Sequence, residues 1–349
     1  MKKLAVLFGG MSSEHDVSIV SGTSIISNLD KNKYEIFPIY IDKNGKFYEY
    51  NKPINEIKIL SVGDEIKEIS KIDNIIDYLN NVDVIFPVLH GLYGEDGTIQ
   101  GLLELIGKPY VGCKVLSSSV CMDKIYTKIL FERAEINTAK GMYLKKYQDK
   151  YLYIDSAFNE YILNYEELVS KVEDYLKYPV FIKPSRQGSS VGVNKAKNES
   201  DLIKYLEEAF TYDEKVLVEE TIVGREVECA VLGNDELIVS PVGEVLSAEE
   251  FYTFDSKYKN SASRTVIPAN IDSKIMADIQ MLAKKAYRAC DCLGLSRVDF
   301  FIEKDTNKIV LNEINTLPGF TEISMYPKLI GSLGISYQEL LDKLIELAK

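Results

Sequence analysis

Residues 295–315, LSRVDFFIEKDTNKIVLNEIN, have the pattern of two β-strands joined by a short polar connection. Arg297 and Asp299 lie two residues apart on the first strand. Glu313 and Asn315 lie two residues apart on the second. Because side chains at i and i+2 point to the same face of a strand, pairing of the strands gathers all four groups on one face. Polar groups buried among apolar side chains need partners, so the hairpin predicts either a structural arginine–acid salt bridge or a site for a charged ligand.

The side chains of this hairpin suit a bound metal–phosphate group. Asp299, Glu313 and Asn315 present hard oxygen ligands, and Mg²⁺ takes few such ligands while sharing its other positions with water and phosphate. Arg297 supplies a planar cation for phosphate or for a developing oxyanion. Gly319, in the NTLPGF segment just past the second strand, follows a proline in a turn that offers a backbone N–H to an anion.

The bulk composition predicts a globular protein of two or three domains. The chain has 349 residues, of which 46% are hydrophobic and 27% are charged, and this composition can build full cores. The net charge of -12 argues against a nucleic-acid partner, because such binding depends on Lys and Arg that neutralise phosphates. No run of ~18 apolar residues occurs, so no membrane span is predicted. The five cysteines are interpreted as reduced, buried thiols of a cytoplasmic protein.

Residues 1–115 alternate strands and helices, which predicts a parallel sheet covered on both faces. KLAVLF, YEIFPIYID and VDVIFPVLH are the predicted strands, with KFYEY as a possible edge strand. Ser12 or Ser13 is expected to cap the helix that follows the first strand. Active sites on such sheets lie beyond the carboxyl ends of the strands, where two glycine-rich stretches, FGGMSSEHDVS and GLYGEDG, occur.

The rest of the chain does not continue the regular alternation of strands and helices. SSVCMDKIYTKILFERAEI is predicted to be one helix, KGMYLKK a strand, and the tyrosine-rich stretch after it mostly helical. Residues 181–195 have the pattern strand, Gly/Ser loop, strand. From residue 216 onward, strand patterns predict an antiparallel sheet covered by helices. Residues 246–264 have no clear periodicity and are a candidate functional loop, a lid over a site.

Several further motifs each leave two interpretations open. FIKPSRQGSSVGV, in which Lys183 ends a strand, is either a plain hairpin turn or a phosphate cradle of backbone N–H groups and hydroxyls. Glu14 is either a partner of the helix dipole or a ligand for a substrate ammonium. His90 directly follows a strand and is either structural or functional. Lys124 and Lys128 share one helix face, which is either a solvated surface or part of a site.

Taken together, eight motifs of the chain match those of one protein family in the same order. The chain resembles the D-alanine–D-alanine ligases of the ATP-grasp superfamily over nearly its whole length. The matching stretches, in order, are FGGMSSEHDVS, PVLHGLYGEDGTIQG, MDK, FIKPSRQGSSVGV, VEETIVGREVE, SKY, RVDFF and NEINTLPGFTEISMYPKL.

The resemblance implies an α/β and α+β fold. An N-terminal parallel α/β (preATP-grasp) domain is followed by a two-lobed ATP-grasp fold. The implied units are an N-terminal substrate domain, a central ATP-grasp lobe and a C-terminal lobe with the metal site, at residues 1–120, 121–215 and 216–349. The implied activity is ATP-dependent ligation of two D-alanines through an acyl phosphate, for peptidoglycan precursor synthesis. The family is commonly dimeric, so a homodimer is expected.

The resemblance also implies the nucleotide and metal ligands. The carboxylates and amide of the hairpin bind two Mg²⁺ or Mn²⁺ ions on the ATP phosphates. Family members often carry Lys where Glu220 stands. The implied ligands are Asp299, Glu313 and Asn315 for the metals, Lys124, Lys183 and Lys257 for the phosphates, and Glu219, Glu220, Ile222 and Glu226 for adenine and ribose.

The implied substrate site lies at the other end of the phosphates. One carboxylate holds the ammonium of the first D-alanine, and a hydroxyl holds the carboxylate of the second. An arginine and a backbone N–H stabilise the oxyanion, and a hydrogen-bonded trio closes the lid. These groups are Glu14 with His90 close by, Ser324, Arg297 with the Gly319 N–H, and the trio Ser189, Tyr258 and Glu14.

The second substrate is the finest question that the resemblance raises. Relatives that use D-lactate place a histidine in the lid, whereas the only two histidines here are His15 and His90. Relatives that use D-serine typically have arginine where Met325 stands, and a thioether is a poor anchor for a hydroxyl. D-alanine is therefore expected, with D-serine as the alternative. Two other classes of protein share part of the pattern. Another ATP-grasp carboxylate–amine ligase would lack the SSEHDVS and ISMYPKL segments. A nucleotide-binding protein without activity would be expected to have lost a metal ligand or the arginine.

Overall fold

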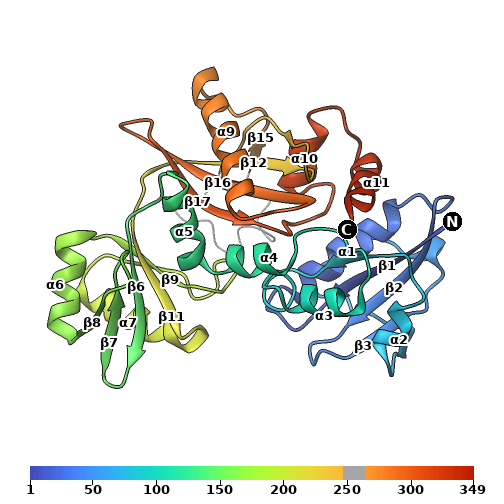
Figure 1. The fold of residues 1–349 in the computed structure, drawn as a ribbon, viewed down its shortest axis with the longest axis horizontal. Coiled ribbons are helices and arrows are strands. Elements are labelled where there is room, and N and C mark those ends of the chain that lie inside the picture. Colours follow the sequence, from blue (N-terminus) through green and yellow to red (C-terminus); the bar gives the residue numbers. More distant parts are fainter. Residues whose placement is uncertain (247–263) are drawn as a thin grey trace.

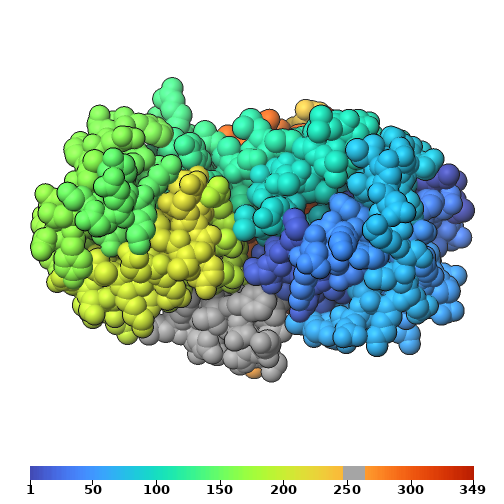
Figure 2. Space-filling model, turned by 90° about the horizontal axis from the view of Figure 1, so that it is seen from below, coloured from blue at the N-terminus to red at the C-terminus, as the bar shows by residue number. Residues whose placement is uncertain are grey.

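The molecule is built on three β-sheets, which Figure 1 shows arranged along its length. The structure is a computed structural model that describes residues 1–246 and 264–349. The N-terminal sheet and the central sheet lie at opposite ends, and the C-terminal sheet lies between and above them. Viewed from below, the central part of the chain (green and yellow) and the N-terminal part (blue) lie side by side, with the segment that links them (teal) between them (Figure 2).

The N-terminal sheet has the strand order β4-β3-β2-β1-β5. Strands β1, β2 and β5 are parallel, whereas β3 and β4 run antiparallel at one edge. Every residue from Leu4 to Phe8 is fully buried, as expected for a strand covered on both faces. The elements are β1 (Lys2–Gly9), α1 (His15–Asn28), β2 (Tyr34–Ile41), β3 (Phe47–Tyr50), η1 (Ile54–Glu56), β4 (Ile69–Lys71), α2 (Ile75–Leu79), β5 (Val84–Val88) and α3 (Thr98–Ile106).

The central sheet is antiparallel, with the order β10-β9-β11-β6-β7-β8. The expectation of a mostly helical tyrosine-rich stretch is wrong, because its first half forms two strands. Tyr151 and Tyr153 alternate into the core of this sheet, a period of two that favours a strand over a helix. The elements are β6 (Gly141–Tyr147), β7 (Lys150–Ile154), β8 (Glu160–Leu163), α6 (Tyr165–Tyr175), β9 (Val180–Pro184), β10 (Asn194–Ala196), α7 (Glu199–Tyr212) and β11 (Lys215–Glu220).

The C-terminal sheet contains the expected hairpin, formed by β16 and β17. Its strand order is β15-β14-β12-β16-β17, and β13 pairs with β12. Helix α9 covers one face, and α10 and α11 join a core shared with α1 and β1. The elements are β12 (Gly224–Leu232), β13 (Ile238–Val239), β14 (Gly243–Leu246), β15 (Arg264–Val266), α9 (Ser273–Ala289), β16 (Leu295–Glu303), β17 (Ile309–Asn315), α10 (Met325–Gly331) and α11 (Tyr337–Leu347).

Two short helices cross the middle of the molecule (Figure 1). The sequence predicted one helix here, but α4 (Val115–Met122) and α5 (Lys124–Arg133) are separated at Asp123. Asp123 has extended backbone angles, φ −91° and ψ 101°, and its side chain accepts hydrogen bonds from the first turn of α5. The prediction failed because the apolar spacing continues across a residue whose carboxylate caps a new helix.

All five cysteines are free and buried, as expected of reduced thiols. The Sγ atoms of Cys121 and Cys292 are 3.9 Å apart. Within residues 1–246 and 264–349, no helix has both the length and the apolar character needed to cross a bilayer.

Candidate active site

The hairpin confirms that the four predicted polar groups share one face. Arg297 lies opposite Asn315, and Asp299 lies opposite Glu313. Arg297 Nε and Nη2 donate to the two carboxylate oxygens of Asp299 at 2.7 and 2.6 Å. Asn315 Nδ2 also donates to Asp299, at 3.0 Å. The arginine–acid salt bridge, one of the two interpretations that the sequence left open, is therefore present, and the interpretation as a ligand site stays a prediction.

A second acid, on the neighbouring strand, was missed by the sequence analysis. Glu228 on β12 lies opposite Asp299, and its Oε2 is 3.0 Å from Arg297 Nε. Burial alone lowers the pKa of Arg297, but the carboxylates of Asp299 and Glu228 raise it well above its usual value. The alternation of Glu226 and Glu228 on a predicted strand was the available signal.

The hairpin offers a partial ligand set for a divalent metal. Asp299 and Glu313 are cross-strand neighbours, and a β-bulge follows Asp299, a feature that re-aims side chains near active sites. Among the described residues, no three His, Cys, Asp or Glu side chains form a complete metal cage. Two carboxylates and an amide fit an ion whose remaining ligands are phosphate and water. Since Arg297 holds both oxygens of Asp299, a metal here shares or displaces that contact.

Three charged groups, of which Lys128 and Glu219 are buried and Lys183 is partly buried, meet between α5, β9 and β11. Glu219 Oε1 is 2.5 Å from Lys128 Nζ, and Glu219 Oε2 is 2.6 Å from Lys183 Nζ. Burial alone raises the pKa of Glu219, but the two ammonium groups lower it to about 2. The interpretation of Lys128 as part of a solvated face is wrong, because only 8% of this residue is exposed. The sequence did not reveal that this helix face packs against β11.

Lys124 points at the Gly/Ser loop. Its Nζ donates to the backbone carbonyl of Gln187 at 2.6 Å. Burial lowers the pKa of Lys124, and the ammonium of Lys183 lowers it further, whereas Glu313 opposes the shift. The loop therefore begins beside two lysines, as a phosphate cradle requires.

Glu14 lies where the N-terminal sheet meets the Gly/Ser loop. It is 7% exposed, and Ser189 Oγ donates to its Oε1. A Cβ atom on either Gly91 or Gly188 would lie 2.7 Å from Glu14 Oε2. Both glycines therefore leave the room that this carboxylate occupies. The structure brings two members of the expected trio together; the third, Tyr258, lies outside the described residues.

The expected serine cap of α1 is wrong. Glu14 occupies the N-cap position and makes no side-chain cap. Ser12 Oγ instead donates to the carbonyl of His90 at 2.6 Å and accepts from Glu14 N at 3.1 Å. The hydroxyl is used to tie two loops at the carboxyl ends of β1 and β5.

His90 is 3% exposed, and both of its ring nitrogens have protein partners. Nδ1 lies 3.0 Å from the carbonyl of Leu317 and Nε2 lies 2.9 Å from Ser21 Oγ. Burial lowers the pKa of His90, which favours a neutral ring that donates to the carbonyl and accepts from the hydroxyl. The ring links the N-terminal sheet to the segment after β17.

Glu95, which the sequence analysis did not single out, lies beside His90. Its Oε1 accepts from the N–H of Gly91 at 2.9 Å and is 4.0 Å from His90 Nδ1. Burial and the nearby Glu14 carboxylate raise the pKa of Glu95 to about 8. The GEDG motif was its only signal in the sequence.

Gly319 and Ser324 adjoin each other after β17. A Cβ atom on Gly319 would lie 3.3 Å from Ser324 Oγ. That hydroxyl also accepts from Thr321 N at 3.1 Å. Met325, at the position where relatives that use D-serine typically have arginine, is 8% exposed and packs in the apolar core.

The remaining predicted residues lie at the edges of the site or outside the described chain. Glu220 Oε1 accepts from Lys140 N at 2.8 Å, Ile222 is partly buried, and Glu226 is exposed. Lys257, Tyr258 and most of the candidate lid at 246–264 fall outside the described residues.

Fold and site together define a protein in which two antiparallel sheets carry a cluster of lysines, an arginine and carboxylates, next to a separate α/β sheet. The family model described as D-ala D-ala ligase N-terminus matches residues 3–113, and the one described as D-ala D-ala ligase C-terminus matches residues 148–346. The D-alanine--D-alanine ligase of Caldicellulosiruptor bescii is 48% identical, with 99% of this chain and 94% of the relative covered. D-alanine--D-alanine ligase B of Clostridium tetani is 50% identical, with 99% and 93% covered.

Solved structures agree with the sequence relatives. The VanG D-Ala:D-Ser ligase of Enterococcus faecalis matches with a TM-score of 0.84 at 39% identity, with 99% of each chain covered. The D-alanine--D-alanine ligase of Bacillus anthracis complexed with ATP matches with a TM-score of 0.75 at 31% identity, with 99% of this chain and 97% of that chain covered. The chain belongs to the D-alanine–D-alanine ligase family, and its fold is the expected ATP-grasp fold.

Proposed function

We propose that this protein joins two D-alanines into D-alanyl-D-alanine with ATP, through an acyl phosphate, and so supplies peptidoglycan precursor synthesis. The family membership and the names of the relatives support this activity. The observation that carries it is one continuous set of charged groups. Two buried lysines hold Glu219, the arginine–aspartate hairpin lies on the next sheet, and Glu14 lies beside Ser189.

The nucleotide end has the cations that the reaction needs. Lys124 and Lys183 bind the ATP phosphates, and Lys257 reaches the γ-phosphate. Asp299, Glu313 and Asn315 hold two Mg²⁺ or Mn²⁺ ions, which neutralise charge on the transferring phosphoryl group. Their hard oxygen chemistry supports this assignment.

Adenine and ribose bind along the segment that joins β11 to β12. Glu219, Glu220, Ile222 and Glu226 line this segment, and Glu219 also fixes Lys183. The hydrogen bond between Glu220 and Lys140 N keeps the Glu220 carboxylate at the edge of the strand.

The substrate end orients two amino acids. Glu14 binds the ammonium of the first D-alanine, and Ser324 binds the carboxylate of the second. His90 positions the loop beside the first subsite. When the second amine attacks the acyl phosphate, Arg297 and the N–H of Gly319 stabilise the oxyanion, a contact that is strong in a water-excluded site.

The acyl phosphate hydrolyses in water, so the reaction needs a closed site. Residues 246–264 are the proposed lid, and the trio Ser189, Tyr258 and Glu14 closes it. The contact between Ser189 and Glu14 supports this proposal.

D-serine is a second candidate for the second substrate, because one solved neighbour is a D-Ala:D-Ser ligase. Residue 325 is a buried methionine and supplies no guanidinium to anchor a hydroxyl, which favours D-alanine. We also propose that the protein is a homodimer and acts in the cytoplasm. Light scattering after size exclusion measures the molar mass and so tests the dimer.

Product analysis tests the activity. The purified protein is incubated with ATP, Mg²⁺ and D-alanine, with and without equimolar D-serine or D-lactate, and the products are identified by mass spectrometry. D-Ala–D-Ala as the main product supports the proposal. D-Ala–D-Ser as the main product keeps the mechanism but overturns the choice of substrate.

Replacing one metal ligand tests the metal site. Glu313→Ala is expected to lower kcat by about 10²–10³-fold, as loss of one electrostatic contact to the reacting group does. Unchanged turnover of ATP would contradict the assignment of Glu313 to the metal. Replacing Mg²⁺ by Mn²⁺ in the same assay tests which ion serves best.

A further inference from the structure

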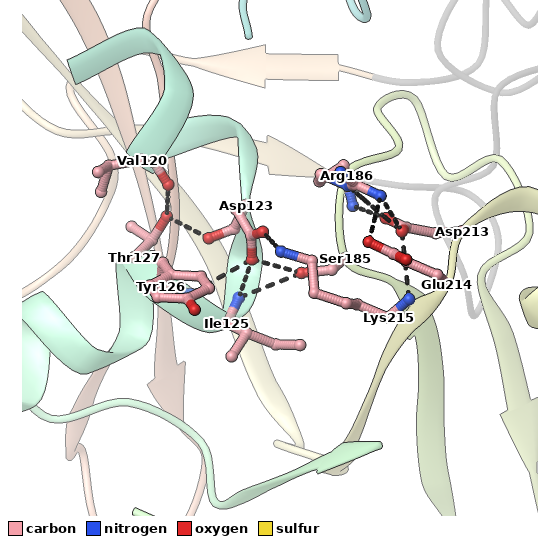
Figure 3. Close-up of polar contacts among 10 residues, drawn as sticks. All are labelled: Val120, Asp123, Ile125, Tyr126, Thr127, Ser185, Arg186, Asp213, Glu214 and Lys215. Atoms are coloured by element: carbon pink, nitrogen blue, oxygen red, sulfur yellow. Dashed lines mark hydrogen bonds and ion pairs between the residues drawn. The ribbon is translucent and has the colours of Figure 1, made fainter. Parts of the chain in front are cut away.

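A second cluster of buried charges lies behind the phosphate site, and the proposed function gives it no role. Figure 3 shows Asp123, Ser185 and Lys215 meeting between α5, β9 and β11. Their exposed fractions are 5%, 0% and 8%. Lys215 Nζ forms an ion pair with Asp123 Oδ2, and Ser185 Oγ donates to Asp123 Oδ1 at 2.6 Å.

Asp123 fixes the start of helix α5. Its Oδ1 accepts from Ile125 N at 3.2 Å and from Tyr126 N at 3.3 Å. This cap sets the first helical residue, which is Lys124. The direction of the Lys124 side chain toward the Gly/Ser loop therefore depends on where Asp123 is held.

The same cluster fixes the start of the Gly/Ser loop. Ser185 N donates to the carbonyl of Lys215 at 2.9 Å, and the carbonyl of Ser185 accepts from Lys124 N at 3.0 Å. The next residue is held from the other side, since Arg186 N and Nη2 donate to Asp213 at 2.8 and 2.7 Å. Ser185 is thus tied to both α5 and β11, and Arg186 is tied to Asp213 at the end of α7 (Figure 3).

We propose that Asp123 and Lys215 form a buried positioning pair that holds Lys124 and the Gly/Ser loop at the spacing required by the nucleotide phosphates. The proposal rests on the proposed function, because it assigns a role within the same nucleotide site. Their contacts are with the starts of α5 and of the Gly/Ser loop, so both act through Lys124 and the loop.

Charge and stability arguments support a positioning role. Burial lowers the pKa of Lys124, and the neighbouring carboxylate of Asp123 opposes this shift. A buried ion pair adds little net stability compared with apolar residues of similar volume. Stability alone therefore does not explain why an ion pair occupies this place. The positions that the pair imposes on Lys124 and on the Gly/Ser loop do explain it.

Binding of a non-hydrolysable ATP analogue, AMP-PNP with Mg²⁺, to the full-length protein tests the pair without requiring ligation. In the double variant Asp123→Asn, Lys215→Met, asparagine retains an acceptor for the helix cap, and no buried charge is left unpaired. We expect Kd by calorimetry to rise about tenfold or more, since a misplacement of ~1 Å costs up to ~100-fold at such sites. KM for ATP rises in parallel, and KM for D-alanine stays unchanged.

Matched variants separate positioning from general destabilisation. Lys146→Met removes a lysine that pairs with Glu207 on the surface of the same sheet and is expected to bind the analogue like the wild type. Lys215→Arg keeps the charge and is expected to restore binding. Ser185→Ala removes one hydrogen bond to Asp123 and is expected to give a smaller rise in Kd, which keeps the test valid if the double variant does not fold.

Two results would overturn the proposal: unchanged analogue binding in the folded double variant, or an equal loss in Lys146→Met. If the double variant is less stable to heat but binds the analogue normally, the pair is structural and the proposal fails. If the wild type makes no dipeptide while the double variant still loses analogue binding, the positioning pair stands and the ligase assignment fails.

Discussion

Two glutamates at opposite ends of the site are both largely buried, yet they have opposite protonation behaviour. Glu219 lies at the nucleotide end, where two lysine ammonium groups at 2.5 and 2.6 Å lower its pKa to about 2. Glu95 lies at the substrate end, where burial and the Glu14 carboxylate raise its pKa to about 8. Its hydrogen-bonding partner is the backbone N–H of Gly91.

The difference shows that the neighbours of a buried acid decide its charge. The nucleotide end holds its glutamate ionised and keeps a surplus of cations, which suits a polyphosphate. At the substrate end Glu95 has no lysine partner in the described chain and is largely protonated below pH 8, which leaves Glu14 as the carboxylate for an incoming ammonium. The two ends are thus matched to the two kinds of charge that the proposed reaction brings together.

Loss of charge at the nucleotide end is expected to have the largest effect. Glu219→Gln leaves Lys128 and Lys183 buried without their carboxylate, and breaking a buried pair in this way costs about 3–5 kcal/mol. We expect a lower free energy of unfolding in urea and a higher KM for ATP. Because the pKa of Glu219 is lowered from 4.5 to about 2, its contribution to stability is present above pH 4.5 and is lost as the pH falls toward 2.

Glu207→Gln is the matched control, because Glu207 pairs with a lysine in the same part of the fold but is about half exposed. Exposed pairs contribute little, about 0–1 kcal/mol. Equal losses of stability in the two variants would contradict the importance of the pairing of Glu219 with Lys128 and Lys183.

An intermediate effect is expected where the two ends meet. Gly188→Ala adds a Cβ atom that would lie 2.7 Å from Glu14 Oε2, so either the loop or the carboxylate must move. We expect KM for D-alanine to rise on the order of tenfold, the scale expected when a binding group is displaced by a fraction of an ångström. Gly101→Ala, on a helix with no heavy atom within 4 Å of the added Cβ, is the control and should leave KM unchanged. A normal KM in Gly188→Ala would mean that the contact at Glu14 is not needed for binding.

The sequence allowed prediction of groups that share one local element. The hairpin cluster was found because side chains two apart on a strand point the same way. Glu14 was found because parallel strands present their carboxyl ends together. In each case the rule needed only the local conformation.

Partners that depend on packing between elements were not predictable in this way. Lys128 looked solvated because nothing in its own helix indicates that the face packs against Glu219. The break at Asp123 has a local cause, its cap of α5, but its further partners, Ser185 just after β9 and Lys215 on β11, were not predictable. Such contacts depend on tertiary structure, so a single sequence contains no local signal for them.

The smallest effect is expected from the same chemical change at the substrate end. Below pH 8 Glu95 is largely protonated, and glutamine has nearly the shape and hydrogen-bonding capacity of a neutral carboxyl. At pH 4, below the unfolded pKa of 4.5, Glu95→Gln is therefore expected to change the free energy of unfolding by less than about 1.5 kcal/mol, the usual value of one hydrogen bond.

The pH dependence of this variant distinguishes the two ends most sharply. Because folding raises the pKa of Glu95 from 4.5 to about 8, its stabilising contribution is present below pH 4.5 and is lost as the pH rises toward 8. Glutamine does not titrate, so the stability of Glu95→Gln relative to the wild type is expected to increase between pH 5 and pH 8, about 1.4 kcal/mol for each unit of pKa shift at most. The other charged groups that face Glu95 are Glu14, His90 and Arg297, and all three are present in both proteins. Urea denaturation at several pH values measures it, and a flat difference would show that Glu95 is ionised like Glu219.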